Sequence, residues 1–271
     1  MSKRIAFIGG GNMASAIIGG LIGQGFAASQ IDVVEPFAPA QEKLKNSYGL
    51  NAQGQPGTFL KQADMVIWAV KPQTFKEAAL LACAHTSNAL HLSVAAGIRS
   101  HSIAHWLGSE RVVRAMPNTP ALIGKGISAL FARLAVSSED KDWVGQVMAT
   151  TGDFLWLDAE EKLDAVTALS GSGPAYMFYF MEAMTTAGTE MGLTREQAHR
   201  LTVATFIGAG ELARSASEPP KILRQRVTSK GGTTYAAISS LEDDDVQAQL
   251  INAIYAARQR AKELGDEFGG A

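Results

Sequence analysis

The first half of the chain alternates between short apolar runs and longer stretches that carry apolar residues at helical spacing. The runs, rich in β-branched side chains, predict strands at residues 5–8, 30–35, 65–70, 89–95, 111–116, 127–132 and 154–157. The other stretches predict helices at residues 12–21, 36–48, 72–84, 100–107 and 138–150, with a shorter one at 56–62. Because strands and helices alternate, we expect an α/β fold with a parallel sheet and right-handed crossovers.

From about residue 161 the strand-like runs stop, and Ala, Met, Leu, Glu and Arg recur at helical spacing. This second pattern predicts helices at residues 163–168, 174–191, 194–216, 220–228 and 233–264. Thr194 and Gln197 are spaced as a capping box at the start of the third of these helices. We therefore expect two domains, an α/β domain over residues 1–160 and an all-α domain over residues 161–271.

Several helices of the second half are apolar on more than one face, as the run Ala-Tyr-Met-Phe-Tyr-Phe-Met at residues 175–181 illustrates. A helical domain of roughly 110 residues cannot bury that much apolar surface by itself. A second copy of the chain is the simplest cover, so we expect at least a homodimer.

The turn after the first strand has a distinctive spacing of glycines. Gly9, Gly11 and Ala14 occupy the pattern G-x-G-x-x-[G/A] directly between a predicted strand and a predicted helix. A phosphate can approach backbone N–H groups closely where no Cβ intrudes, and the first turn of a helix leaves such groups unpaired. The turn therefore predicts a site for the pyrophosphate of a dinucleotide. The alternative is a tight turn that packs helix on sheet and binds nothing.

The second predicted strand ends in an acid, Glu35, which lies 21 residues after Ala14. A carboxylate at this place can accept hydrogen bonds from the hydroxyls of the adenosine ribose. It would repel a 2′-phosphate, and no arginine lies near it before the next helix. Our hypothesis is a preference for NADH with some use of NADPH.

The charge and the cysteine content argue against nucleic acid, a disulfide and a zinc site. A formal net charge of −2 and a pI of about 6.2 provide no basic field for nucleic acid. Cys83 is the single cysteine, so no intrachain disulfide can form, and no Cys/His cluster has the spacing of a zinc site. We expect a cytoplasmic protein without a metal. The first apolar run is too short for a signal peptide and no run could span a bilayer, so we expect no membrane association.

Three other strand ends have distinctive residues, small in the first two and proline-flanked in the third. They are residues 69–72 (Ala-Val-Lys-Pro), 94–97 (Val-Ala-Ala-Gly) and 114–120 (Arg-Ala-Met-Pro-Asn-Thr-Pro). Open α/β sheets bind ligands at the carboxyl ends of their strands, and small residues would let a flat nicotinamide ring lie against the backbone. In the alternative interpretation, Lys71 is a solvated strand end and the two prolines around Asn118 only shape a loop.

The helical half contains a loop of hydroxyls and glycines at residues 228–234 (Thr-Ser-Lys-Gly-Gly-Thr-Thr) that opens a helix. Its N–H groups could hold a small carboxylate by the argument used for the phosphate. The alternative is a well-capped helix start, since Ser and Thr are good N-cap residues. A second glycine-rich segment, residues 169–176, precedes the first long helix.

Five segments together resemble the pyrroline-5-carboxylate reductase family, in that family's order and over nearly the whole chain. They are residues 7–13, 69–72, 114–120, 171–176 and 231–234. The resemblance implies reduction of the cyclic imine Δ1-pyrroline-5-carboxylate to L-proline by NAD(P)H, the last step of proline biosynthesis. It implies a Rossmann-type dinucleotide-binding domain followed by an all-α domain for substrate binding and dimerisation, with dimers that can assemble into larger rings such as decamers.

The resemblance also assigns residues to the two ligands. The cofactor contacts fall on Ile8, Gly9, Gly10, Gly11, Asn12, Met13, Ala14, Ala69, Val70, Lys71 and Pro72. Glu35 joins this set through the argument from its position given above. The substrate contacts fall on Ser229, Gly231, Gly232, Thr233 and Thr234. Thr234 is our candidate catalytic residue, as the hydroxyl that hydrogen-bonds the ring nitrogen. Lys230 departs from the family pattern, because many relatives have proline there.

Two rival functions remain to be weighed. A β-hydroxyacid dehydrogenase has a similar two-domain plan, but such enzymes use a lysine on the helix after a Gly-rich segment, and here no lysine follows Gly171–Pro174 until Lys221. A non-catalytic dinucleotide sensor would not need the Gly-Gly-Thr-Thr run at residues 231–234. We interpret the histidines, none of which lies in a motif, as ordinary surface or core residues.

Overall fold

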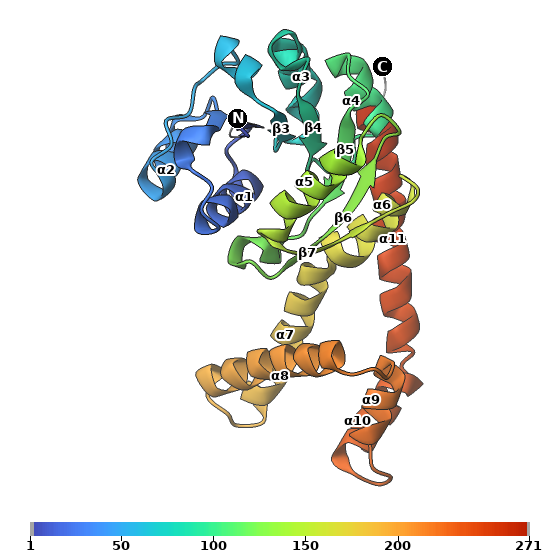
Figure 1. Cartoon of the computed structure of the whole chain (residues 1–271). Coiled ribbons are helices and arrows are strands. Elements are labelled where there is room, and N and C mark those ends of the chain that lie inside the picture. The colour runs from blue at the N-terminus through green and yellow to red at the C-terminus, as the bar shows by residue number, and fades with distance from the viewer. Residues whose placement is uncertain (1–2, 270–271) are drawn as a thin grey trace. The chain divides into compact units, whose positions relative to one another are not determined.

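The computed structural model describes residues 3–269, which form two compact units (Figure 1). Unit 1 comprises the chain up to Ser172 together with the residues from Ala257 onward, and unit 2 comprises Gly173–Ala256. The domain boundary after residue 160, drawn from the change in sequence pattern, stays a prediction.

Unit 1 is built on a seven-stranded sheet in the order β2-β1-β3-β4-β5-β6-β7. The strands are β1 (Ile5–Ile8), β2 (Ile31–Val34), β3 (Met65–Trp68), β4 (Leu90–Ser93), β5 (Val112–Met116), β6 (Gly126–Ala132) and β7 (Gly152–Trp156). Both ends of each strand lie within two residues of the ends predicted from the sequence.

The direction of β6 corrects the expectation of a wholly parallel sheet. The first five strands pair in parallel, whereas β6 pairs antiparallel with β5 and β7 then runs parallel to β6. Only the short helical turn Thr119–Ile123 lies in the connection from β5 to β6. A parallel crossover needs about a dozen residues or more, so a connection this short reverses the strand.

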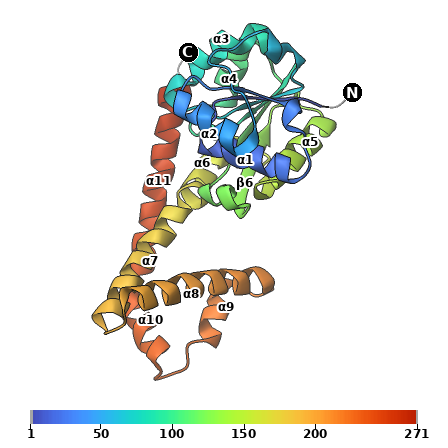
Figure 2. The same ribbon diagram turned by 90° about the vertical axis from the view of Figure 1, so that its left-hand side faces the viewer.

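Helices cover both faces of the sheet (Figure 2). They are α1 (Asn12–Gly23), α2 (Ala38–Tyr48), α3 (Pro72–Thr86), α4 (Ser100–Leu107), α5 (Ser138–Ala149) and α6 (Lys162–Val166). Alternate strand residues supply the two cores: Phe7 packs with α1, α2 and α5, while Ile8 packs with α3 and α4. This alternation follows from the two-residue period of a strand and explains why β1 and β3 are apolar throughout.

Unit 2 consists of α7 (Gly173–Glu190), α8 (Arg195–Ser215), α9 (Pro220–Arg226), α10 (Thr233–Asp243) and the first part of α11 (Val246–Gly269). The capping box predicted at Thr194 and Gln197 is present. The single helix expected over residues 233–264 was wrong, because Asp245 adopts a positive φ of 53° between α10 and α11. Acidic side chains are unfavourable at the negative end of a helix, and Asp tolerates the left-handed conformation, so the run of acids at residues 242–245 ends α10.

Unit 2 keeps large apolar side chains at its own surface. The most exposed include Tyr179 (71%), Ile207 (61%) and Tyr255 (62%), from three different helices. This agrees with the prediction that these helices are apolar on more than one face. No helix in the described part of the chain is long and apolar enough to cross a membrane.

Candidate functional site

The carboxyl ends of four neighbouring strands lie level with one another in unit 1. Ile8 is in register with Val34 on one side and with Trp68 on the other, and Trp68 is in register with Ser93. The residues that follow these ends, including Gly9, Glu35 and Ala69, are therefore neighbours at one edge of the sheet. This is the edge at which open α/β sheets bind ligands.

Gly9 makes the tight turn that the sequence pattern predicted. It has a positive φ of 97°, and a Cβ there would lie only 2.6 Å from the carbonyl oxygen of Ala69. Its N–H donates to the carbonyl of Val34 at 2.8 Å. Any other residue at this position would be strained by the backbone conformation and would push β1 away from the end of β3.

Gly11 begins α1 and leaves room above the helix start. It is exposed, and a Cβ there would meet no described atom within 4 Å. Among the described residues no side chain caps this helix. The N–H groups of its first turn therefore face an open space at the positive end of the helix dipole, which suits a pyrophosphate. The rest of the predicted segment runs from the end of β1 into the start of α1 and consists of Ile8, Gly10, Asn12, Met13 and Ala14.

Glu35 is more buried than a ribose-binding acid at the end of a strand would need to be. Its Oε2 accepts a hydrogen bond from the Gly10 N–H at 2.7 Å, and its Oε1 accepts one from the Phe37 N–H at 2.8 Å. The residue is 9% exposed. The carboxylate therefore holds the glycine turn and the start of α2 together. The Gly10 N–H already donates to Glu35, so it is not free to bind a phosphate.

The segment after β3 starts α3 beside the glycine turn. The Ala69 N–H donates to the carbonyl of Ile8 at 2.8 Å, and Pro72 is the first residue of α3, with Lys71 as its N-cap. Ala69, Val70 and Pro72 are half-buried, while Lys71 is exposed. The small, half-buried residues form a surface next to the turn. Lys71 is exposed beside them, and its role as a cofactor contact stays a prediction.

The proline-rich segment after β5 contacts a wide helical turn. Asn118 Nδ2 donates to the Ser170 carbonyl at 3.2 Å, and its Oδ1 accepts from the Ile127 N–H at 3.0 Å. Ser170 belongs to a π-helix over Thr167–Gly171, and π-helices occur often at functional sites. Two segments that the sequence analysis singled out are thus joined by one buried amide.

A network of buried charges was missed by the sequence analysis. Arg114 in β5 pairs with Glu160 at 2.6 Å, and Arg99 pairs with Asp164 at 2.8 Å. Burial alone would raise the pKa of the Glu160 carboxyl, but the charge of Arg114 and the hydrogen bonds from Ser100 hold it below its ordinary value. Burial lowers the pKa of Arg114. An arginine inside an otherwise apolar strand was the one signal that pointed to a buried partner.

The predicted substrate loop lies in unit 2, between α9 and α10. Gly231 has a φ of 76°, and the Gly232 N–H donates to the Ser229 carbonyl at 3.0 Å. Gly232 is the N-cap of α10, which among the described residues has no side-chain cap. Thr233 and Thr234 are exposed in the first turn. The alternative of a helix start capped by Ser or Thr side chains is therefore wrong, and the N–H groups are available to a carboxylate.

A cavity of about 350 Å³ lies beside this loop in unit 2. Lys230 and Tyr235 line it, together with Arg224, which forms an ion pair with Glu242 at 2.8 Å. The cationic side chain that departs from the family pattern thus lies at the rim of the loop, where it would attract rather than repel a carboxylate.

Two family models match the chain, one in its helical half and one in its α/β half. Residues 160–264 match the family model described as pyrroline-5-carboxylate reductase dimerisation. Residues 4–97 match the model described as NADP oxidoreductase, coenzyme F420-dependent.

Relatives match the chain over its whole length. A pyrroline-5-carboxylate reductase of Pseudomonas aeruginosa is 46% identical over 270 residues, which cover 99% of each chain. The solved structure of such a reductase from Coxiella burnetii has a TM-score of 0.90 and 38% identity, covering 97% of this chain and 99% of that one. The structure from Plasmodium falciparum, which has NADP bound, has a TM-score of 0.87 and 28% identity, with coverage of 97% and 98%.

Proposed function

The chain belongs to the pyrroline-5-carboxylate reductase family, and on that basis we propose how its residues carry out the reaction. It is an NAD(P)H-dependent oxidoreductase that reduces Δ1-pyrroline-5-carboxylate to L-proline. A hydride from the reduced nicotinamide joins the C=N carbon, the nitrogen carries the proton, and the nucleotide leaves oxidised. The residue roles given below are our proposal.

The turn from Gly9 to Ala14 holds the pyrophosphate in this proposal. Support comes from the open space above Gly11, from the uncapped start of α1 and from the close approach of Gly9 to Ala69. The half-buried surface of Ala69, Val70 and Pro72 lies next to this turn and would carry the nicotinamide end. The glycine turn and this surface are therefore suited to the pyrophosphate and the nicotinamide of NAD(P)H.

The uncapped start of α10 holds the substrate carboxylate. Its first-turn N–H groups point to the positive end of the dipole, and the hydroxyls of Ser229 and Thr233 add donors beside them. An anion bound there lies within reach of Thr234. This exposed, uncapped helix start with two threonines is the observation that carries the assignment.

Thr234 supports the proton on the ring nitrogen. An imine accepts a hydride readily once its nitrogen is protonated, so the site needs to hold the protonated form and to orient it, and it needs no strong acid. The protonated nitrogen donates to the hydroxyl oxygen of Thr234, and that hydroxyl, with water, is a path for the proton. The carboxylate contact fixes the ring while this hydrogen bond fixes its rotation.

Substitution of Thr234 tests this role. Loss of one such hydrogen bond costs about 1–3 kcal/mol, so Thr234→Ala should lower kcat/KM for the imine by roughly 5- to 150-fold. The dissociation constant for NADH, measured by fluorescence, should not change, because the cofactor residues lie in the other unit. Thr234→Ser keeps the hydroxyl and serves as the matched control. Full kcat/KM in Thr234→Ala would remove the role.

The assembly and the location of the enzyme follow as further parts of the proposal. The family model for dimerisation covers the whole of unit 2, and a second copy of the chain would bury that unit's exposed apolar side chains, so the working form is at least a homodimer. A ring of five dimers is the larger assembly that the family resemblance implies. We place the enzyme in the cytoplasm, on the support of its single cysteine.

A further inference from the structure

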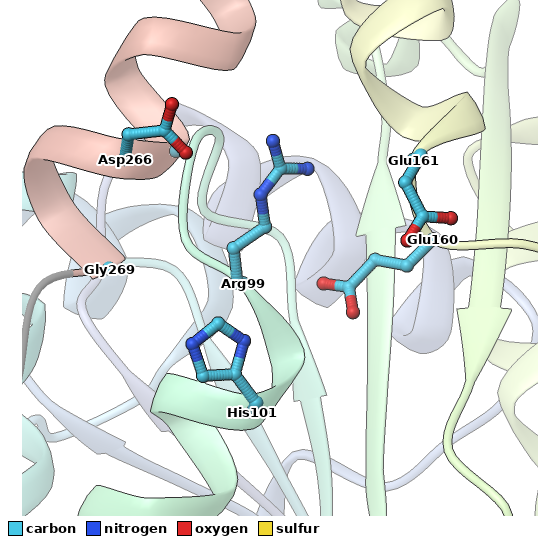
Figure 3. A pocket seen from close by; sticks show the side chains of 7 residues that line it. Arg99, His101, Glu160, Glu161, Asp266 and Gly269 are labelled. Carbon is cyan, nitrogen blue, oxygen red and sulfur yellow. The ribbon is translucent and has the colours of Figure 1, made fainter.

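A cavity of about 450 Å³ in unit 1 is lined mainly by charged side chains, and acids outnumber bases among them. Figure 3 shows the carboxylates of Glu160 and Asp266 on either side of Arg99. The guanidinium of Arg99 already forms an ion pair with Asp164 at 2.8 Å. Because its one strong cation is paired and acids surround it, this cavity is unsuited to an anion.

The cavity beside the substrate loop in unit 2 has the opposite balance of charge. Arg224, Lys230 and Glu242 line it, together with hydroxyl groups such as that of Tyr235. Arg224 Nη1 donates to Glu242 Oε1 at 2.8 Å, so these two charges offset each other. No residue in the described part of the chain forms an ion pair with Lys230. One net positive charge therefore remains, on the loop itself.

The backbone around Lys230 leaves most of its N–H groups without an acceptor. Over residues 229–235, only the Gly232 N–H donates to a described atom, the Ser229 carbonyl at 3.0 Å. Gly231, which follows the lysine, has a φ of 76°. A residue in this conformation brings successive N–H groups into the kind of concavity that binds anions. The ammonium group of Lys230 therefore extends from a loop whose backbone also suits an anion.

Lys230 is exposed, as are Thr233 and Thr234 after it. An exposed ammonium group attracts an anion without being held in one geometry by neighbours. Water and salt weaken such an attraction, and an exposed charge pair changes an equilibrium only a few-fold. The effect of this lysine on a bound carboxylate should therefore be modest and should depend on ionic strength.

We propose that Lys230 determines substrate specificity by charge: its ammonium group attracts the substrate carboxylate to the loop, so the enzyme favours cyclic imines that carry a carboxylate. This inference rests on the proposed function, in which the start of α10 binds that carboxylate. The backbone N–H groups fix the carboxylate at short range, and the lysine adds an attraction that acts over a longer distance.

Two substrates of the same ring size separate this role from other effects of the loop. Δ1-Pyrroline has the C=N bond of the proposed substrate and lacks its carboxylate. Its ring carries only a positive charge when the nitrogen is protonated, so Lys230 cannot attract it. The lysine should therefore raise kcat/KM for the carboxylated imine and should not raise it for Δ1-pyrroline.

The first experiment measures kcat/KM for both imines in the full-length enzyme at low ionic strength. Lys230→Gln should lower the ratio of kcat/KM for the carboxylated imine to kcat/KM for Δ1-pyrroline by about two- to fivefold. Lys230→Arg, which keeps the charge, should retain most of the wild-type ratio. A substitution that only disturbed the loop would lower kcat/KM for both imines and leave their ratio unchanged.

A second lysine provides the control for net charge. Lys61 is exposed in the short helical turn Thr58–Gln62, which precedes the amino end of β3. The cofactor residues follow the carboxyl ends of the strands, at the opposite edge of the sheet. Lys61→Gln removes the same charge as Lys230→Gln, and we expect it to leave the ratio as it is in the wild type.

The second experiment varies the ionic strength and separates charge from shape. The Debye length falls from about 30 Å at 0.01 M to about 10 Å at 0.1 M ionic strength. Added salt should lower kcat/KM for the carboxylated imine in the wild type, where it screens an attraction. It should raise kcat/KM in Lys230→Glu, where it screens a repulsion. A change in loop shape would not reverse the sign of this salt effect.

Two outcomes would overturn the proposal. The first is a Lys230→Gln enzyme with the wild-type ratio for the two imines, and the second is a Lys230→Glu enzyme whose kcat/KM falls with salt as that of the wild type does. If Lys230→Glu does not fold, the ratio in Lys230→Gln decides. A wild-type enzyme that reduces neither imine would refute the proposed function itself, whereas an active enzyme that no substitution of Lys230 alters would refute this inference alone.

Discussion

Glu35 is a side chain that holds the backbone at the place where a cofactor is expected. Its two oxygens accept hydrogen bonds from the N–H groups of Gly10 and Phe37, which fastens the glycine turn to the start of α2. The same carboxylate is a negative charge at the place where the adenosine ribose of a dinucleotide is expected. The preference for NADH over NADPH therefore stays a prediction that depends on this one charge.

Removing that charge should change the choice of cofactor. We expect Glu35→Ser to raise the ratio of kcat/KM with NADPH to kcat/KM with NADH by about tenfold, since the repulsion of the 2′-phosphate is lost. Glu35→Gln, which keeps the acceptor oxygen but not the charge, should show part of this change. Steady-state assays with both cofactors measure the ratio. An unchanged ratio, or a wild type that already prefers NADPH several-fold, contradicts the assignment.

His91 gives the stability of unit 1 a dependence on pH. It is fully buried in β4, its Nδ1 accepts from Trp68 Nε1 at 3.2 Å, and burial followed by the charge of Arg111 lowers its pKa to about 4. The unfolded chain, with a His pKa near 6.5, takes up this proton first as the pH falls. Stability therefore falls between about pH 6.5 and pH 4, by on the order of 3 kcal/mol from this group.

Urea unfolding at pH 7 and at pH 4.5 checks the contribution of His91. His91→Gln keeps an acceptor for Trp68 and cannot titrate, so its free energy of unfolding should fall less between these pH values than that of the wild type. Other groups titrate equally in both proteins, and the difference isolates His91. Parallel pH dependence in the two proteins would contradict the assignment.

Among the elements, the π-helix before α7 is held by Asn118. Both ends of its buried amide are paired, to the Ser170 carbonyl and to the Ile127 N–H. Asn118→Ala would leave these two backbone groups without their partner, and we expect a loss of about 1–3 kcal/mol in the free energy of unfolding. Asn88→Ala, at an exposed position, should change it by less than about 0.5 kcal/mol. Equal effects of the two substitutions in denaturant unfolding would argue against this bridge.

Elements with strong local signals were predicted well, and those set by the rest of the fold were not. The turn at Gly9 and the capping box at Thr194 follow from residues within a few positions of each other. The reversal of β6 follows from the short connection between residues 116 and 127, whose length was part of the prediction, but the alternation of strands and helices led us to expect parallel strands throughout. The end of α10 before Asp245 was visible in the sequence only as a run of acids. Because the apolar residues on both sides keep helical spacing, we predicted one continuous helix there.

In the whole molecule, the two ligand-binding segments of the candidate site could be predicted from the sequence, but the buried ion pairs and close contacts behind them could not. The glycine turn and the substrate loop have recognisable residue types at fixed spacing, and the structure gives both an uncapped helix start. Arg99, Asp164 and Gly265 have no such pattern, because they lie far apart in the chain and meet only in the folded unit 1.

The exposed apolar surface of unit 2 predicts that the enzyme is at least a dimer in solution. Light scattering at micromolar concentration should give at least twice the chain mass of 28.7 kDa. The pair of substitutions Tyr179→Glu and Ile207→Glu should lower that mass and the activity, since a charge buried between copies is costly. Leu134→Glu, at a fully exposed position in unit 1, should change neither. A monomer in the wild type would contradict the assembly.

The central claim is that the glycine turn of unit 1 and the loop at Gly232 of unit 2 serve one reaction. The most direct measurement is the absorbance at 340 nm when Δ1-pyrroline-5-carboxylate is added to the full-length enzyme with NADH, and separately with NADPH. The account predicts a fall in absorbance matched mole for mole by L-proline, and its loss in Gly9→Ala as well as a strong reduction in Thr234→Ala. Turnover that survives either substitution unchanged, or no turnover with either cofactor, would contradict it.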